Sequence, residues 1–122
     1  MPENIFVRFG GKYVRLAFDK VLYFEADRNF VKIHYASNSY LLMLTMRQLE
    51  KEIPSNFCRV HRSFIVNLDL VQSFDAEQLW FAEKVVPISR YYREWLMNSI
   101  RILKADNKSI DTITTAEMKI LN

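Results

Sequence analysis

Short β-prone runs separated by turns constrain the fold of this chain more than any other feature. The runs at residues 5–9, 21–25 and 30–35 have the length of strands and are too short for most helices. Gly10-Gly11 follows the first run and marks a tight hairpin, because both glycines accept a positive φ. This spacing predicts a mainly β domain with an open, loop-rich surface.

The remainder of the chain continues this pattern. A polar turn at Asp27-Arg28-Asn29 precedes the run at 30–35, and a hairpin is expected around residues 82–84. Further extended runs are expected at residues 13–18, 40–44, 58–67, 70–74, 79–81 and 85–88.

Two short helices are expected between or after the strands. Thr45 and Gln48 have the spacing of a capping box, which satisfies two backbone N–H groups at a helix start. Ser89 is a favourable N-cap for a last amphipathic helix that ends near residue 100. We assign residues 1–104 to one domain and residues 105–122 to a C-terminal tail that could form a short helix.

Composition excludes several functional classes. The net charge of +3 permits nucleic-acid binding without proving it. One cysteine and no visible signal peptide or membrane span favour a cytoplasmic protein with no membrane partner. Cys58 and His61 are three residues apart, so on one strand they would face opposite sides. With two histidines and one cysteine there is no zinc set, so we expect no enzyme, no catalytic residue, no metal and no cofactor.

A local excess of positive charge lies in the middle of the chain. Arg59, His61 and Arg62 come directly before a β-prone apolar run, and no acidic residue occurs between Ile53 and Leu68. Such a segment is suited to meeting phosphate groups.

The same segment carries a resemblance to a known family. Its order F-x-R-V-H-R-S-F-I-V-N at residues 57–67 resembles the core signature of the LytTR-type DNA-binding domain, the output domain of many bacterial response regulators of the LytR/AlgR type. Similar matches lie in order at residues 22–33, 49–50 and 86–92. The resemblance covers about residues 5–101. It implies an elongated stack of small antiparallel sheets that inserts loops into successive major grooves of double-stranded DNA and regulates transcription.

The resemblance also implies three base-reading residues. Asn29 could read adenine, and Arg62 could read guanine through two parallel donors. Arg90 would oppose the dipole of its own helix, so a DNA contact gives it a reason to lie there. The structural alternatives are a left-handed turn residue at Asn29, a solvated arginine at Arg62 and an aromatic-covering stem at Arg90.

Seven further residues are expected to contact the DNA backbone or to support the readers: Arg28, Lys32, Arg59, His61, Ser63, Tyr92 and Arg93. For His61 a packed or hydrogen-bonded structural role is favoured. Cys58 is expected to be a small buried residue, the alternative being a reactive thiol near the DNA that could switch binding off.

Two other functions remain open. A single-stranded nucleic-acid-binding β domain could stack bases on strand aromatics, here Phe30, Tyr35, Tyr40 and Phe64. A protein-interaction module could pair its strand edges with a partner, although this leaves the arginine cluster unexplained. The family resemblance implies two copies on repeated half-sites of an operator. A receiver domain or sensor partner would lie outside this chain, which is then an excised domain or a stand-alone regulator.

Overall fold

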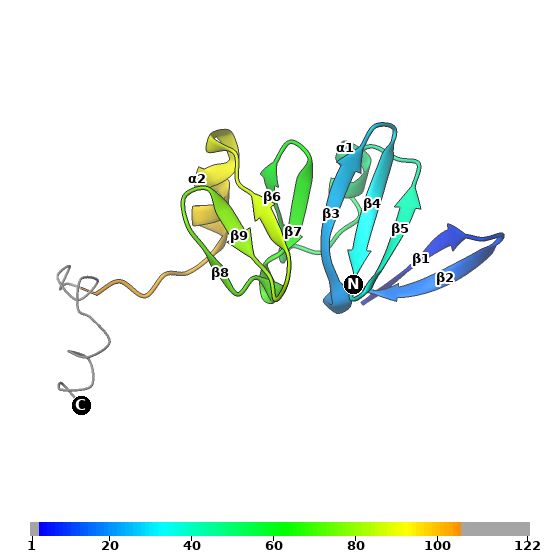
Figure 1. The fold of residues 1–122 in the computed structure, drawn as a ribbon, viewed down its shortest axis with the longest axis horizontal. Helices are drawn as coiled ribbons and strands as arrows, with labels where there is room; N and C mark the ends of the chain where they lie inside the picture. The colour runs from blue at the N-terminus through cyan, green and yellow to red at the C-terminus, as the bar shows by residue number, and fades with distance from the viewer. Residues whose placement is uncertain (1–2, 106–122) are drawn as a thin grey trace, which may run out of the picture.

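A five-stranded antiparallel sheet, in the order β5-β4-β3-β7-β6, forms the centre of the computed structural model, which describes residues 3–105. A two-stranded sheet (β1-β2) lies at one end, and a three-stranded sheet (β10-β9-β8) lies with helix α2 at the other end (Figure 1). The elements are β1 (Asn4–Phe9), β2 (Lys12–Ala17), η1 (Phe18–Lys20), β3 (Val21–Asp27), β4 (Phe30–Tyr35), β5 (Asn38–Leu42), α1 (Met46–Glu50), β6 (Phe57–His61), β7 (Phe64–Asn67), η2 (Leu68–Leu70), β8 (Ser73–Phe74), β9 (Gln78–Trp80), β10 (Val85–Pro87) and α2 (Arg90–Ser99). The expected mainly β stack of small sheets is confirmed.

The central sheet separates two hydrophobic cores. Phe24, Ile33 and Ile65 pack on one side with residues from the β1–β2 hairpin and α1. Tyr23 and Val66 lie in the second core with residues from β9, β10 and α2. Adjacent strand residues point to opposite faces, so neighbours such as Ile65 and Val66 serve different cores. The sheet therefore holds both ends of the molecule.

The structure confirms the predicted Gly10-Gly11 turn and the two predicted helix caps, which depend on local turn and cap chemistry. Gly10 and Gly11 have φ values of 62° and 77° at the β1–β2 turn. Thr45 and Gln48 form both bonds of a capping box at the start of α1. Ser89 caps α2, its side chain accepting from the N–H of Tyr92.

Two expected strands were wrong. The run at 58–67 is a hairpin of β6 and β7, because the chain reverses at Arg62-Ser63. A register shift between Arg59 and His61 accompanies the reversal. The run at 70–74 is extended only at β8, since residues Leu68–Leu70 form a 3₁₀ turn. The short helix expected in the 105–122 tail lies, except for residue 105, outside the described residues.

Candidate nucleic-acid interface

Three segments that carry the expected base readers lie along one edge of the molecule. They are the β3–β4 turn, the β6–β7 turn and the start of α2, all at the upper edge of Figure 1. Two backbone hydrogen bonds join them. The N–H of Ala26 donates to the carbonyl of Ser63 at 2.8 Å, and the N–H of Ser89 donates to the carbonyl of Val60 at 2.9 Å. The spacing of the three segments is thus fixed by the sheet.

Each of these segments exposes one expected reader. Asn29, Arg62 and Arg90 are all exposed, and none of them takes part in an ion pair within residues 3–105. Arg90 is the first residue of α2, where the free N–H groups and the helix dipole already carry positive potential. An exposed guanidinium at this position is available to an anionic or hydrogen-bond-accepting ligand.

The β3–β4 turn has an unusual backbone. Arg28, not Asn29, adopts the left-handed conformation, with φ at 60°. A side chain with a Cβ is disfavoured there by roughly 1–2 kcal/mol, so this turn is held by its surroundings. The alternative that Asn29 is present because it tolerates a left-handed conformation is therefore wrong. The turn geometry gives no reason for an asparagine at this position.

An apolar surface lies beside this turn, of which only Phe30 was identified from the sequence, as a candidate for base stacking. Arg28, Asn29, Phe30 and Met43 are among the residues that line a groove of about 390 Å³. Phe30 is 38% exposed and Met43 is 77% exposed. The position of Phe30 directly after the turn could have indicated this surface from the sequence. Met43 comes from a separate segment, so nothing in the sequence indicated that it lies here.

Arg59 is held by four internal contacts. Its guanidinium pairs with the Glu50 carboxylate at 2.7 Å, donates from Nε to the carbonyl of His61 at 3.1 Å, and donates from Nη2 to the carbonyl of Arg62. It also lies 5.5 Å from the ring centroid of Tyr92. One side chain thus connects α1, the β6–β7 turn and α2. This arrangement was not visible in the sequence, where Arg59 was expected at a phosphate.

His61 closes the β6–β7 turn from the other side. Its Nδ1 accepts a hydrogen bond from the N–H of Ser63 at 3.0 Å, so Nε2 carries the proton of the neutral ring. Burial lowers the pKa of His61, and the positive charges of Arg62 and Arg59 lower it further. The hydrogen bond from Ser63 supports the structural role that was favoured for His61.

The remaining supporting residues are half-buried around these segments. Lys32 lies opposite Glu25 in the β3–β4 ladder. Tyr92 packs edge-on against Trp95, with ring centroids 5.2 Å apart. The Nε of Arg93 is buried and has no hydrogen-bond partner among the described residues.

Cys58 lies beneath the edge rather than on it. It is buried between β6 and α2, and its Sγ is 3.7 Å from the hydroxyl of Ser99. Burial raises the pKa of the thiol, so the thiolate is disfavoured. The expectation of a small buried residue is confirmed, and the reactive-thiol alternative loses its electrostatic basis.

Most strand aromatics proposed for base stacking are occupied. The hydroxyl of Tyr35 accepts from the N–H of Ala17 at 3.0 Å, and Tyr40 packs edge-on against Phe9. Phe64 is partly buried and packs against the second core. Only Phe30 of the four is exposed. A single-stranded stacking platform therefore has little support on these strands.

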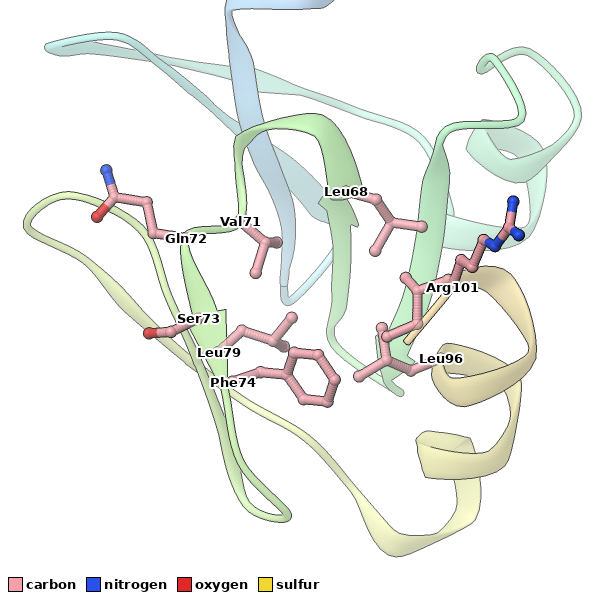
Figure 2. A pocket seen from close by; sticks show the side chains of 9 residues that line it. Leu68, Val71, Gln72, Ser73, Phe74, Leu79, Leu96 and Arg101 are labelled. Carbon is pink, nitrogen blue, oxygen red and sulfur yellow. The ribbon is translucent and has the colours of Figure 1, made fainter. Parts of the chain in front are cut away.

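A separate apolar pocket of about 390 Å³ lies near the C-terminal end of α2. Figure 2 shows Phe74, Leu79 and Leu96 facing into it, with the Arg101 guanidinium directed away. Its lining holds no pair of acid and base side chains. Within the described part of the chain, no helix has the length and apolar character to cross a membrane.

Comparison with known proteins identifies the chain's relatives. It is 40% identical over 55 residues to the CO-responsive transcriptional regulator RcoM of Rhodospirillum rubrum, covering 44% of this chain and 23% of that protein. It is 29% identical over 92 residues to the sensory transduction protein LytT of Bacillus subtilis, covering 67% of this chain and 37% of that protein. The chain thus spans well under half the length of either relative.

A solved structure has the same fold. It is the LytTr DNA-binding domain of a Bacillus cereus response regulator, which matches with a TM-score of 0.71 at 21% identity and covers 81% of this chain and 97% of the other. The family model of the LytTr DNA-binding domain matches residues 11–101. Because this match includes well over half of the sequence, the chain belongs to the LytTr DNA-binding domain family.

Proposed function

We propose that this domain binds double-stranded DNA in a sequence-specific manner, inserting the β3–β4 turn, the β6–β7 turn and the start of α2 into successive major grooves. The observation that carries the proposal is the joining of these three segments by the Ala26–Ser63 and Ser89–Val60 hydrogen bonds along one edge. A rigid row of exposed polar side chains is what reading several base pairs at once requires.

The readers have distinct chemical tasks in this proposal. The amide of Asn29 pairs with adenine N6 and N7, and the guanidinium of Arg62 pairs with guanine O6 and N7. Arg90 reads a further base from the start of α2. The apolar surface of Phe30 and Met43 suits a thymine methyl group beside the β3–β4 turn.

The supporting residues then divide into two groups. Arg28, Lys32 and Arg93 contact phosphates, which set affinity without carrying sequence information. Arg59, His61, Ser63 and Tyr92 shape the β6–β7 turn and its contact with α2, so they act on DNA through Arg62.

The domain serves a bacterial transcriptional regulator in this proposal. Its relatives bear the names of a transcriptional regulator and a sensory transduction protein, and each is longer than the matched segment. A receiver or sensor domain, joined to this domain or acting on it, would control DNA binding. We expect a cytoplasmic protein without catalytic activity, bound as two copies to repeated half-sites.

Selection from a random duplex pool at moderate salt tests the proposal. The protein should enrich one motif, and the enriched duplex should compete better than its separated strands. Enrichment of no motif would refute specific reading. Preference for the single strand would move the domain to the stacking class.

A further inference from the structure

The β1–β2 hairpin has one face that no core covers. Ile5, Val7, Val14 and Leu16 pack toward the first core. The alternate residues are exposed and pair across the two strands: Phe6 with Arg15, and Arg8 with Tyr13. Phe6 is 56% exposed and Tyr13 is 67% exposed. Figure 1 shows the hairpin projecting from the end of the molecule opposite α2.

Each pair on this face is a cation above an aromatic ring. The guanidinium carbon of Arg8 lies 5.4 Å from the ring centroid of Tyr13, and that of Arg15 lies 5.1 Å from that of Phe6. A guanidinium stacked in this way keeps its N–H donors free at the rim. Because each ring already has a cation over one face, it is a poor platform for stacking a base. This face can therefore bind a ligand through guanidinium N–H donors rather than by stacking on its aromatic rings.

The charge of this hairpin is entirely positive. Residues 4–17 contain Arg8, Lys12 and Arg15 and no acidic residue. Neither arginine has a carboxylate within ion-pair distance among residues 3–105. Arg8 and Arg15 are thus two unpaired cations on the outer face, which is complementary to a polyanion, whereas Lys12 lies on the side of Val14 and Leu16.

The proposed function supplies one polyanion, a DNA duplex longer than the specific site. The edge that carries the three reading segments, here called the reading edge, is at the top of Figure 1, whereas the hairpin leaves the lower end of the central sheet and projects beyond the β5 side. A duplex flank that reaches the hairpin must therefore bend toward the β5 side. Six extended residues span roughly 20 Å. A duplex carries about one negative charge per 1.7 Å of its axis, so a flank of that length presents roughly a dozen charges. The family match begins at residue 11, so β1 lies outside it.

We propose that the outer face of the β1–β2 hairpin is a second DNA-contacting surface, at which Arg8 and Arg15 bind phosphates of the duplex flanking the specific site. This inference rests on the proposed function. It adds a contact that increases affinity for any sequence and increases its dependence on salt, while leaving base discrimination to the three reading segments.

The test uses the full chain, the selected operator and the double variant Arg8→Gln/Arg15→Gln. Wild-type protein should gain affinity when the operator is lengthened on one side by roughly one helical turn. The variant should lose that gain, and its slope of log K against log salt should fall by about 1.8, or about 0.9 for each lost phosphate contact. Between 50 and 200 mM salt, two such contacts account for about a tenfold change in affinity.

The matched control is Arg101→Gln/Lys104→Gln. It removes the same charge from exposed residues just beyond the C-terminal end of α2. This control should keep most of the salt slope and the full gain from the longer flank. Thermal unfolding of both variants checks that the fold is retained, and each should still discriminate the operator from a scrambled duplex.

Two results would overturn the inference. If the hairpin variant keeps the flank effect and the salt slope of wild type, the face does not bind DNA, and an acidic protein surface becomes its better partner. If the control loses as much slope as the hairpin variant, the effect belongs to net charge alone. Neither result affects the proposed function. The proposed function fails in a different experiment, the selection from a random duplex pool, if no motif is enriched.

Discussion

The exposed side chains of the reading edge differ in what they can recognise. Arg62 presents a two-donor fork whose guanidinium has no ion-pair partner among the described residues, whereas Lys32 is a point charge beside the β3–β4 turn. A fork can distinguish guanine from other bases, while a point charge is suited to phosphate.

Substitution separates the two tasks. Arg62→Ala and Arg90→Ala should each weaken operator binding by about 1–3 kcal/mol and flatten the preference at one base position. Lys32→Ala should weaken all sequences alike and reduce the salt slope by roughly one. Titrations of operator and scrambled duplex at several salt concentrations measure both effects. Wild-type binding by both arginine variants would show that the residue assignment is incorrect even within the correct family.

Arg59 requires a different experiment, because its guanidinium is used inside the protein. Arg59→Lys keeps the charge but loses the fork that holds the carbonyls of His61 and Arg62. If Arg59 positions the turn, operator affinity should fall about tenfold while the salt slope stays constant. A lysine variant that binds as tightly as wild type would instead support a phosphate contact. Glu50→Gln, which removes the ion-pair partner, should produce a weaker change in the same direction.

At the scale of elements, sequence reasoning succeeded where the signal was local. The Gly10-Gly11 turn and the Thr45 and Ser89 caps each depend on a few adjacent residues. The β6–β7 hairpin was missed because its turn residues, Arg62 and Ser63, do not have the positive φ that selects Gly, Asn or Asp in a two-residue turn. The sequence therefore carries no turn signal at this position.

Contacts distant in sequence explain the rest of the β6–β7 hairpin. Arg59 and His61 hold its turn, and Arg59 in turn depends on Glu50 from α1 and on Tyr92 from α2. Such partners are unknown until the fold is known. The family resemblance could indicate Arg62 as a reader, but it could not reveal that its turn is held by a neighbour expected at a phosphate.

Packing of α2 on β6 gives a measurable consequence for Cys58. Because the thiol is buried beneath α2 and its pKa is raised, labelling of the folded domain should be slow with and without DNA. Leu96→Ala removes a side chain that is 1% exposed and should cost about 2–5 kcal/mol of stability. Labelling should then accelerate as α2 detaches. Fast labelling of the wild-type protein would contradict the burial of Cys58.

His34 links the central sheet to the β9–β10 turn. Its Nε2 lies 2.8 Å from Glu25, its Nδ1 lies 3.4 Å from the Lys84 ammonium, and its ring stacks on Tyr23. Burial lowers the pKa of His34 below its ordinary value of 6.5, with Lys84 and Lys32 acting in the same direction and Glu25 opposing them.

The consequence is a stability that falls in mild acid. Between the folded-state pKa and 6.5, the unfolded chain binds more protons at this site than the folded chain. The free energy of unfolding should therefore decrease as the pH drops below about 6.5 and level off below the folded-state pKa. Urea unfolding from pH 7.5 to 5 measures this. His34→Gln should flatten part of the dependence, and His61→Gln should flatten a separate part; an unchanged profile in His34→Gln would contradict the assignment.

At the scale of the whole molecule, one reading edge carries limited information. The three proposed base contacts, at about 1–3 kcal/mol each, would supply about 3–9 kcal/mol of discrimination. Competition from about 10⁶–10⁹ genomic sites requires roughly 8–12 kcal/mol. A single edge falls at or below this range, whereas two copies on repeated half-sites would reach it.

We therefore expect a monomer in solution that binds a single half-site one to one and a repeated site two to one. Sedimentation of the protein with each duplex, at protein concentrations above the dissociation constant, measures the stoichiometry. The discrimination between operator and scrambled duplex should rise steeply from the single to the repeated site, because both edges then contribute. Two copies on a single half-site would mean that protein–protein contact drives assembly. One copy on the repeated site would mean that a single edge reads the whole operator, and the specificity would have to come from DNA shape as well as from the three readers.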